Sequence, residues 1–393
     1  MLISRHGLRE ATARRVAEAA QVSVSLVNYH FKDRNGLIGA VYEDELVRHR
    51  AWLEDAAGAL AEAVAGPEHL ADWLSAFVMR RALNSDTVAL ERILWINAGR
   101  VPGLAGLAQD WMAAVEAFAG QIAAQFQLGV EAQDHLAEFY LSSDLLVSPA
   151  MSDQAGLTLA NLAARRFAAR LSGVGAGDDA APDLFDALHG ALVRSHESPP
   201  AAPGHSASQR IIQAALDIVA RDGADAVNHR VLAREAGVPL GATTRHFTSR
   251  PDILRCAFEH AHAALSEGAR AQAGGAWRMT RSQLAEGSAS SLLTANGDIA
   301  VSMLIMEELV IFAQTDAALS GLARSLVAMR GETSLAVLRA VAEPLAAVTR
   351  TDAFVWSLCT FGMLARLRLT PPGKRAAFVR GRTLGRLTLL GPG

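Results

Sequence analysis

Apolar residues recur along most of the chain at the three- and four-residue intervals of an α-helix. Ile211, Ala215 and Val219, for example, fall on one face of a predicted helix that ends at Gly223. Runs such as Ala-Glu-Ala-Val are more typical of amphipathic helices than of strands, in which apolar and polar residues alternate. The pattern predicts an all-α protein.

The same spacing predicts five long helical segments in each half of the chain. Those of the first half are expected at 36–65, 68–84, 86–98, 104–128 and 132–147. Those of the second half are expected at 252–272, 280–295, 298–314, 319–343 and 351–368. A shorter helix is expected at 183–194.

A sequence repeat relates the two halves. The segment from Arg15 to Phe31 recurs 216 positions later, from Val231 to Phe247, and both copies end in His-Phe. Each copy consists of a short Ala-rich segment, a turn before a valine and a second helical segment. This order is typical of a helix-turn-helix unit, whose second helix can enter the major groove of DNA.

The repeat extends beyond the motif. Residues 2–7 align with 218–223 at the same offset, and 103–108 align with 318–323 after a slip of one residue. Because self-similarity at a long period indicates duplication, we interpret nearly the whole chain as two copies of one domain of about 190 residues.

Glycine and proline mark the boundaries between these domains. Residues 172–179 are rich in glycine, and residues 197–204 are rich in proline. The expected domains are a first helix-turn-helix domain at 1–45, a helical domain at 46–195, a Pro-rich linker at 196–206, a second helix-turn-helix domain at 207–262 and a second helical domain at 263–393.

Composition narrows the class of protein. The chain has two cysteines, Cys256 and Cys359, both in apolar surroundings, so we expect a reducing cytoplasm and no disulfide framework, bound metal or cofactor. Its longest apolar stretch, 299–312, is interrupted by Glu307 and Glu308. The apolar run at the N-terminus is too short for a signal peptide, so no membrane segment is expected.

The net charge of −3 does not suggest a protein that binds polyanions, but positive charges are in local excess in two segments. Residues 1–50 hold eight Lys and Arg against six Asp and Glu, and residues 206–262 hold seven against six. A local excess of this size suffices for a small DNA-binding domain whose fold places a few cations.

In these two segments the chain resembles the tetracycline-repressor (TetR) family of transcriptional regulators, as a tandem fusion. The resemblance is strong over 2–45 and 208–260 and architectural elsewhere. It implies two TetR-like repeats, each a three-helix helix-turn-helix domain followed by a helical ligand-binding and dimerisation domain. It also implies an intrachain pseudo-dimer, with a homodimer of chains as the alternative; the helices expected to form its interface are 104–128 and 132–147 against 319–343 and 351–368.

The resemblance implies a sequence-specific DNA-binding regulator, in most family members a repressor that a small molecule releases. The implied partners are a double-stranded DNA operator and an unknown small-molecule effector. Arg14 and Arg230 are implied to reach a base edge or a phosphate. The residues implied to face the bases are Val24, Ser25, Asn28, Leu240, Gly241 and Thr244. Those implied to touch the DNA backbone are Tyr29, His30, Arg34, Arg245, His246 and Arg250.

The chain departs from the family pattern at several of these positions. Asn28 and Thr244 stand where family members usually have an aromatic residue, and Arg245 replaces a second one. Gln21 stands at the turn where the second copy has Gly237, which costs stability if the position needs a positive φ. Since the copies differ at most groove-facing positions, the operator should be an imperfect palindrome.

Seven residues of the helical domains are candidates for lining a ligand cavity. Aromatic and methionine side chains at helical spacing are more often core residues, so this role competes with simple packing. A carboxylate on an apolar helix needs a partner or a polar ligand, although an exposed stripe or a link to Arg92 is the alternative. We expect at most one good cavity; the candidates are Trp73, Phe77, Glu91, Trp95, Met303, Glu307 and Trp356.

Two other classes of function were weighed. Residues 259–262 hold one Glu-x-x-His, but a di-iron bundle needs two, and phosphate-loop and serine-hydrolase motifs are absent from the sequence, so no enzyme is expected. The other alternative is a ligand-binding or partner-binding module in which one or both helix-turn-helix units have decayed.

The first copy lacks residues that match 208–216 of the second, because Leu2 already aligns with Ile218. A three-helix unit without most of one helix leaves apolar surface exposed. We therefore expect translation to begin at least nine to twelve residues upstream of Met1. The alternative is a weakened first unit held in place by the rest of its domain.

Overall fold

The computed structural model describes residues 2–61, 66–175, 181–194, 207–273, 278–313, 316–342, 345 and 347–391. Within these residues the regular structure is helical, with two isolated β-bridges and no strand. The prediction of an all-α protein is confirmed. The predicted linker, 196–206, lies outside the described residues.

The first half of the chain, here residues 2–194, contains three short 3-10 turns besides its α-helices. The turns are η1 (Leu8–Glu10), η2 (Pro67–His69) and η3 (Pro149–Met151). The helices are α1 (Leu2–His6), α2 (Ala13–Ala20), α3 (Val24–Phe31), α4 (Arg34–Ala61), α5 (Leu70–Ala82), α6 (Ser85–Asn97), α7 (Leu104–Gln125), α8 (Ala132–Leu146), α9 (Gln154–Ser172) and α10 (Pro182–Val193).

The second half, residues 207–391, has a similar order of elements. Its 3-10 turns are η4 (Ala224–Ala226) and η5 (Ala317–Leu319). Its helices are α11 (Ala207–Asp222), α12 (His229–Glu235), α13 (Leu240–His246), α14 (Arg250–Ala273), α15 (Arg281–Leu292), α16 (Val301–Phe312), α17 (Ser320–Ala328), α18 (Glu332–Arg339), α19 (Arg350–Leu369) and α20 (Pro372–Thr388).

Most of the predicted helices are present, and one prediction is wrong. The segment 319–343 is not one helix, because α17 and α18 are separated by a turn at Gly331 with φ 94°. A Cβ at Gly331 would lie 2.6 Å from the Phe354 backbone nitrogen, so this turn passes directly against α19. Helices α9 and α20 were not predicted at all.

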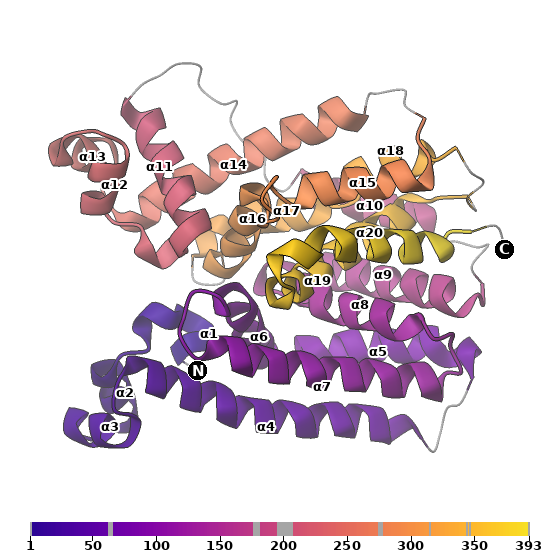
Figure 1. Ribbon diagram of the computed structural model, residues 1–393, viewed down its shortest axis with the longest axis horizontal. Helices are drawn as coiled ribbons and strands as arrows, with labels where there is room; N and C mark the ends of the chain where they lie inside the picture. The colour runs from indigo at the N-terminus through magenta and orange to yellow at the C-terminus, as the bar shows by residue number, and fades with distance from the viewer. Residues whose placement is uncertain are drawn as a thin grey trace.

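Figure 1 shows how the two halves are arranged. Helices α2 and α3 lie at the same end of the molecule as α12 and α13. The long helices α4 and α14 run along opposite sides, away from that end, and α8, α9, α19 and α20 lie between them. The molecule therefore presents two small helical units from one common helical body.

The halves meet chiefly where α8 packs along α19, with α9 also packed on α19. The two backbones approach each other closely at Gly362, where a Cβ would overlap the carbonyl oxygen of Glu138. The predicted pairing of 104–128 with 319–343 is wrong. Helix α7 packs mainly on α4 and α8, because its own half buries Trp111 and Phe118, but it also contacts α19, where Glu116 pairs with Arg366 at 3.0 Å. Helices α9 and α20, which were not predicted, add to the interface.

One hydrophobic core runs through both halves. It includes Phe139 of α8, stacked on Phe167 of α9 with ring centroids 4.4 Å apart, and Phe354 of α19. A second core joins α11 to α14 and α16. The small cluster around Ala17 and Val27 stands apart from both.

Candidate nucleic-acid interface

Two helix-turn-helix units are formed, the first unit by α1–α3 and the second unit by α11–α13. In the first unit, Thr12 caps α2 by accepting the Arg15 N–H at 3.3 Å, and Ser23 caps α3 by accepting the Leu26 N–H at 3.2 Å. In the second unit, Asn228 caps α12 by accepting the Val231 N–H at 3.0 Å. Such caps begin the helices at fixed residues because they satisfy free backbone donors.

The turn between the two helices needs a left-handed residue in both units. Gln21 has φ 55° in the first unit, and Gly237 has φ 62° in the second. The position of Gln21 therefore has the positive φ that its alignment with Gly237 suggested. A residue with a side chain is strained at positive φ, whereas glycine is not.

Helix α3 presents its predicted DNA-facing residues to solvent. Tyr29 is 81% exposed and lies edge-on to His30, with ring centroids 5.3 Å apart. Val27 is buried against α2 and so fixes the opposite face of the helix. The other predicted residues of α3 are also exposed: Val24, Ser25 and Asn28.

Helix α13 presents a matching but chemically different surface. Thr243 is buried, and its hydroxyl donates to the Leu240 carbonyl at 2.8 Å, which holds the inner face. Thr244 is exposed and donates to the Gly241 carbonyl at 3.3 Å. The remaining predicted residues are exposed as well: Leu240, Gly241, Arg245 and His246.

The two arginines that begin these units differ in their surroundings. Arg14 is exposed and pairs with Glu18, one turn later, at 3.2 Å. Arg230 is exposed and has no ion-pair partner in the described part of the chain. A DNA phosphate would compete with a carboxylate for Arg14 but not for Arg230.

Arg34 and Arg250 make the same structural contact in both halves. Arg34 donates to the Leu8 carbonyl at 2.6 Å, and Arg250 donates to the Ala224 carbonyl at 2.8 Å. Arg250 also pairs with Asp225 at 2.9 Å and is partly buried. Both side chains therefore tie the start of a long helix to the 3-10 turn of its unit.

Polar contacts join the two units to each other and to the body. The Arg9 N–H donates to Asp225 at 3.2 Å, across the two units. Arg100 pairs with Glu308 and donates to the Ala220 carbonyl at 3.0 Å, near the end of α11. Glu308 also accepts the Ala224 N–H at 3.1 Å. Burial raises the pKa of Glu308, and the Arg100 guanidinium opposes that rise.

A cavity of about 100 Å³ lies where these contacts meet. It is lined by Gly7 of the first half and by Asp225 and Arg250 of the second, with Asn97 of α6 and Glu308 of α16 below them. The separation of the two units is therefore set by a polar junction between both halves.

The candidate ligand residues do not meet at one site. Trp73 stacks on Phe77, with ring centroids 5.1 Å apart and planes 12° from parallel, inside the first half. Trp95 and Glu307 line one small cavity between the halves. Met303 is partly buried against the core, and Trp356 lies beside Arg386.

Glu91 pairs with buried Arg81 at 2.9 Å in the first half. Burial raises the pKa of Glu91, and Arg81 opposes that rise. Tyr140 lies within 3.5 Å of Glu91 and 3.2 Å of the His49 ring. The suggested link between Glu91 and Arg92 does not form, because Arg92 forms its ion pair with Asp144.

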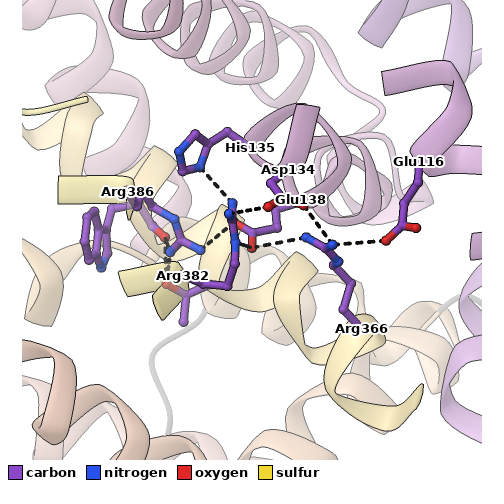
Figure 2. A network of polar contacts seen from close by, with 9 residues as sticks. Glu116, Asp134, His135, Glu138, Arg366, Arg382 and Arg386 are labelled. Atoms are coloured by element: carbon purple, nitrogen blue, oxygen red, sulfur yellow. Dashed lines mark hydrogen bonds and ion pairs between the residues drawn. The ribbon is translucent and has the colours of Figure 1, made fainter. Parts of the chain in front are cut away.

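Charged residues that the sequence analysis missed hold the halves together (Figure 2). Glu138 of α8 accepts hydrogen bonds from Arg382 at 2.6 Å and Arg386 at 2.7 Å, both on α20. Burial acts to raise the pKa of Glu138, but these two arginines outweigh it, so that pKa is lowered. Arg382 also pairs with Asp134 at 2.7 Å.

A second set of charges lies at the first turn of α19. Asp352 accepts hydrogen bonds from Arg166 at 2.7 Å and from Arg170 at 2.8 Å, both on α9. Arg166 and Arg170 precede Arg382 and Arg386 by 216 positions, each pair within an Arg-x-x-x-Arg-Leu pattern. That pattern was the signal in the sequence that could have identified α9 and α20 as interface helices.

Among the described residues, none of the helices combines the length and apolar character needed to span a bilayer. In the same part of the chain, no three His, Cys, Asp or Glu side chains are grouped as metal ligands would be. No curated protein matches the chain at a significant level. Residues 1–41, which include the whole first unit, match the family model described as "Bacterial regulatory proteins, tetR family". The match supports this family, whose members are generally non-enzymatic regulators, and assigns the first unit to its DNA-binding helix-turn-helix domain.

Proposed function

We propose that the chain is a sequence-specific DNA-binding transcriptional regulator whose two helix-turn-helix units bind two half-sites of one operator. The observation that carries this proposal is that α3 and α13 lie exposed at the same end of one chain (Figure 1). An exposed helix of this kind fits the major groove, and two of them on one body suit two half-sites.

We assign the contacts as follows. Arg14 and Arg230 reach base edges or phosphates, because each stands in the first turn after a capped N-terminus. Arg34 and Arg250 contact the DNA backbone, and each also holds the 3-10 turn of its own unit by a hydrogen bond. The base-facing residues are Val24, Ser25, Asn28, Leu240, Gly241 and Thr244, and the other backbone contacts are Tyr29, His30, Arg245 and His246.

We further propose that the two halves are copies of one TetR-like domain. Helices α3 and α13 begin at Val24 and Leu240, and helices α6 and α16 begin at Ser85 and Val301, so both pairs are 216 positions apart. The contact of Arg34 with Leu8 is repeated by Arg250 with Ala224, again at that offset. A duplication accounts for all of these coincidences, and they support the proposal.

In this proposal the halves form a pseudo-dimer within one chain. Asp134 and Asp352 are each the third residue of their helices, α8 and α19. Arg382 of α20 binds Asp134 and Arg166 of α9 binds Asp352, so each arginine comes from the opposite half. Such reciprocal pairing is typical of an interface with two-fold symmetry. Light scattering should give a mass near 41.6 kDa in solution, and a mass of twice that value would mean four units in each particle.

The proposal also includes control by a ligand. We infer a repressor in the cytoplasm that a small molecule releases, with Trp73, Phe77 and Glu91 in one half as the residues nearest a ligand. Their support is the aromatic cluster around a buried carboxylate, since such a group favours a polar ligand. Trp95, Met303, Glu307 and Trp356 remain candidates on the same grounds.

DNase footprinting of the DNA that flanks the gene tests the DNA-binding proposal. We expect two protected half-sites, unequal in sequence, on one face of the duplex. Arg245→Ala should weaken binding, whereas Arg339→Ala, on an exposed position of α18 far from the units, should not. Absence of any protected sequence, with the protein folded, would contradict the proposal.

A second candidate function is a ligand-binding or partner-binding module in which one unit no longer binds DNA. The pairing of Arg14 with Glu18 and the loss of aromatic residues at Thr244 and Arg245 favour it. Protection of a single half-site would support this reading over two working units.

A further inference from the structure

The two helix-turn-helix units contact each other at matching positions of the repeat. The Arg9 N–H, in the turn η1, donates to the Asp225 carboxylate, in the turn η4, at 3.2 Å. Arg9 and Asp225 are 216 positions apart, which is the offset of the sequence repeat. Gly7 and Gly223, another pair at that offset, both have positive φ and both line the cavity between the units. The two turns therefore meet with similar backbones but with different side chains.

The difference in side chains is what allows this contact. Asp225 supplies an acceptor for the Arg9 N–H, whereas an arginine at position 225, as in a copy of the first unit, would offer donors alone. The Asp225 carboxylate also pairs with Arg250 at 2.9 Å. Burial lowers the pKa of Arg250, Asp225 opposes that change, and the charge of Arg9 adds to it. Asp225 therefore places a negative charge between two arginines, one from each half.

A buried ion pair holds the adjoining segment of the second unit to the first half. Arg100, which follows α6, pairs with Glu308 of α16 and donates to the Ala220 carbonyl at 3.0 Å. Ala220 lies in the last turn of α11, where carbonyl groups have no partner within the helix. Glu308 also accepts the Ala224 N–H at 3.1 Å. A Cβ at Gly223 would lie 3.0 Å from Nη1 of Arg100, so the guanidinium packs directly on this segment.

These contacts act on one short stretch of the second unit, residues 219–225. Arg100 of the first half holds the stretch at one point, and Arg9 of the first unit holds it at another. Arg100 and Glu308 are mostly buried, so salt screens their attraction less than it screens a surface pair. We call Arg9, Arg100, Asp225 and Glu308 the unit junction. A change in the separation of the units has to break several of its contacts at once.

We propose that the unit junction holds the two helix-turn-helix units at one fixed separation, with Arg100 and Asp225 as positioning residues, so that the protein selects one spacing of half-sites on duplex DNA. The part that concerns DNA rests on the proposed function. Each added base pair moves a half-site about 3.4 Å along the duplex and turns it by about 35°. Units at a fixed separation cannot follow that change. A molecule that releases DNA by changing the separation has to break the junction.

The fixed separation is tested without DNA, by the distance between two spin labels. The labels are attached at Ala19→Cys and Arg234→Cys, on exposed positions of α2 and α12, in a chain that also carries Cys256→Ser. Pulsed electron paramagnetic resonance should give one narrow distance distribution. Arg100→Met combined with Asp225→Ala should broaden it. A distribution that is already broad with the junction intact, or that stays narrow in the double variant, overturns the proposal.

The spacing of the operator provides the second measurement, after footprinting has identified the half-sites. Duplexes in which the half-sites are one or two base pairs closer or farther apart are compared with the natural duplex as a ratio of Kd values. The wild type should favour the natural spacing by about ten-fold or more, because at any other spacing either one half-site is lost or the junction breaks. The double variant should bring this ratio toward one.

Three single variants distinguish positioning from stability. Leu232→Ala removes buried packing of the second unit and keeps the polar contacts of the junction, so it should weaken binding at every spacing and leave the ratio and the distance distribution unchanged. Asp225→Asn keeps one acceptor oxygen and should keep part of the ratio. Asp222→Asn, at an aspartate that pairs with Arg221 of its own unit, should keep all of it.

The outcomes separate this inference from the proposed function. A wild-type ratio near one, or a ratio that falls as far in Leu232→Ala as in the double variant, overturns the inference while DNA binding stands. A folded protein that protects no operator refutes the proposed function, and the label distances then decide alone whether the unit junction fixes the separation.

Discussion

The two helix-turn-helix units have similar turns but different support. In the second unit, Ile211 and Leu216 of α11 belong to a core that reaches α14 and α16. In the first unit, α1 spans Leu2–His6, and the buried residues that join α2 to α3 form a small separate cluster. Val22 is 40% exposed there, whereas Val238, at the matching position, is 9% exposed.

This difference indicates that the local shape of a unit and its stability have different causes. Caps at Thr12 and Asn228 and left-handed turns at Gln21 and Gly237 give both units the same local shape. Local interactions of this kind are worth about 1 kcal/mol each, whereas buried apolar side chains contribute several. The units should therefore bind DNA in similar poses while differing in their resistance to local unfolding.

One of the two largest expected effects concerns the link between the second unit and the first half. Arg100→Met leaves the Glu308 carboxylate buried without its cation and should destabilise the second unit by about 3 kcal/mol. This value is low for a broken buried ion pair, because burial raises the pKa of Glu308 and the carboxylate can take up a proton. Hydrogen exchange of α11–α13 measures this. Ser4→Ala, which removes the 2.8 Å hydrogen bond from Ser4 to Asp86, is the matched change in the first unit and should cost about 1 kcal/mol. Equal effects of the two changes would remove the distinction.

A second test compares the cores of the units directly. Leu232→Ala should destabilise the second unit by about 2–5 kcal/mol, because Leu232 is fully buried. Val16→Ala, at the matching position of the first unit, should cost about 1 kcal/mol or less, because Val16 is partly exposed. Hydrogen exchange measures the stability of both units. A larger loss of stability for Val16→Ala than for Leu232→Ala would reverse the comparison.

A third test measures what each unit contributes to DNA binding. Arg230→Ala should weaken operator binding by about 1–3 kcal/mol, because the exposed guanidinium of Arg230 pairs with no carboxylate among the described residues. Arg14→Ala should cost less, since Glu18 already competes for that arginine. Titration of a labelled operator gives both values. If Arg230→Ala has no effect while Arg14→Ala does, the second unit takes no part in binding.

The smallest expected effect concerns the turn. Gln21→Gly should stabilise the first unit by about 0.5–1 kcal/mol, because glycine adopts φ 55° without strain. Gly237→Ala should destabilise the second unit by about 1 kcal/mol through the same backbone preference, because a Cβ there meets no neighbouring atom within 4 Å. Changes of equal sign in both variants would contradict this account.

The sequence predicted the elements that depend on local interactions. The two helix-turn-helix units were predicted from the repeated segments 15–31 and 231–247, and the strained turn at Gln21 followed from its alignment with Gly237. The exposure of Tyr29 and Arg230 was likewise implied by their positions in short amphipathic helices. Whether these residues contact DNA stays a prediction.

What the sequence did not predict depends on contacts between distant segments. Helices α9 and α20 carry arginines on faces that are buried only because Asp352 and Glu138 lie opposite them. Periodicity alone marks such faces as solvent-exposed. The break at Gly331 likewise arises from the close passage of α19, which no local pattern near Gly331 reveals.

The contact between α8 and α19 has a consequence for how this protein can change. In an assembly of two identical chains, every substitution in a self-complementary interface occurs twice, once on each side. Here α8 and α19 belong to one polypeptide, and Asp144 and Gly362 stand ten residues after Asp134 and Asp352. A gene that encodes both helices in one chain can place Asp144, the charged partner of Arg92, on α8. It can place Gly362, which admits the neighbouring backbone, at the matching point of α19. The two sides of the interface are thus free to specialise by independent single mutations.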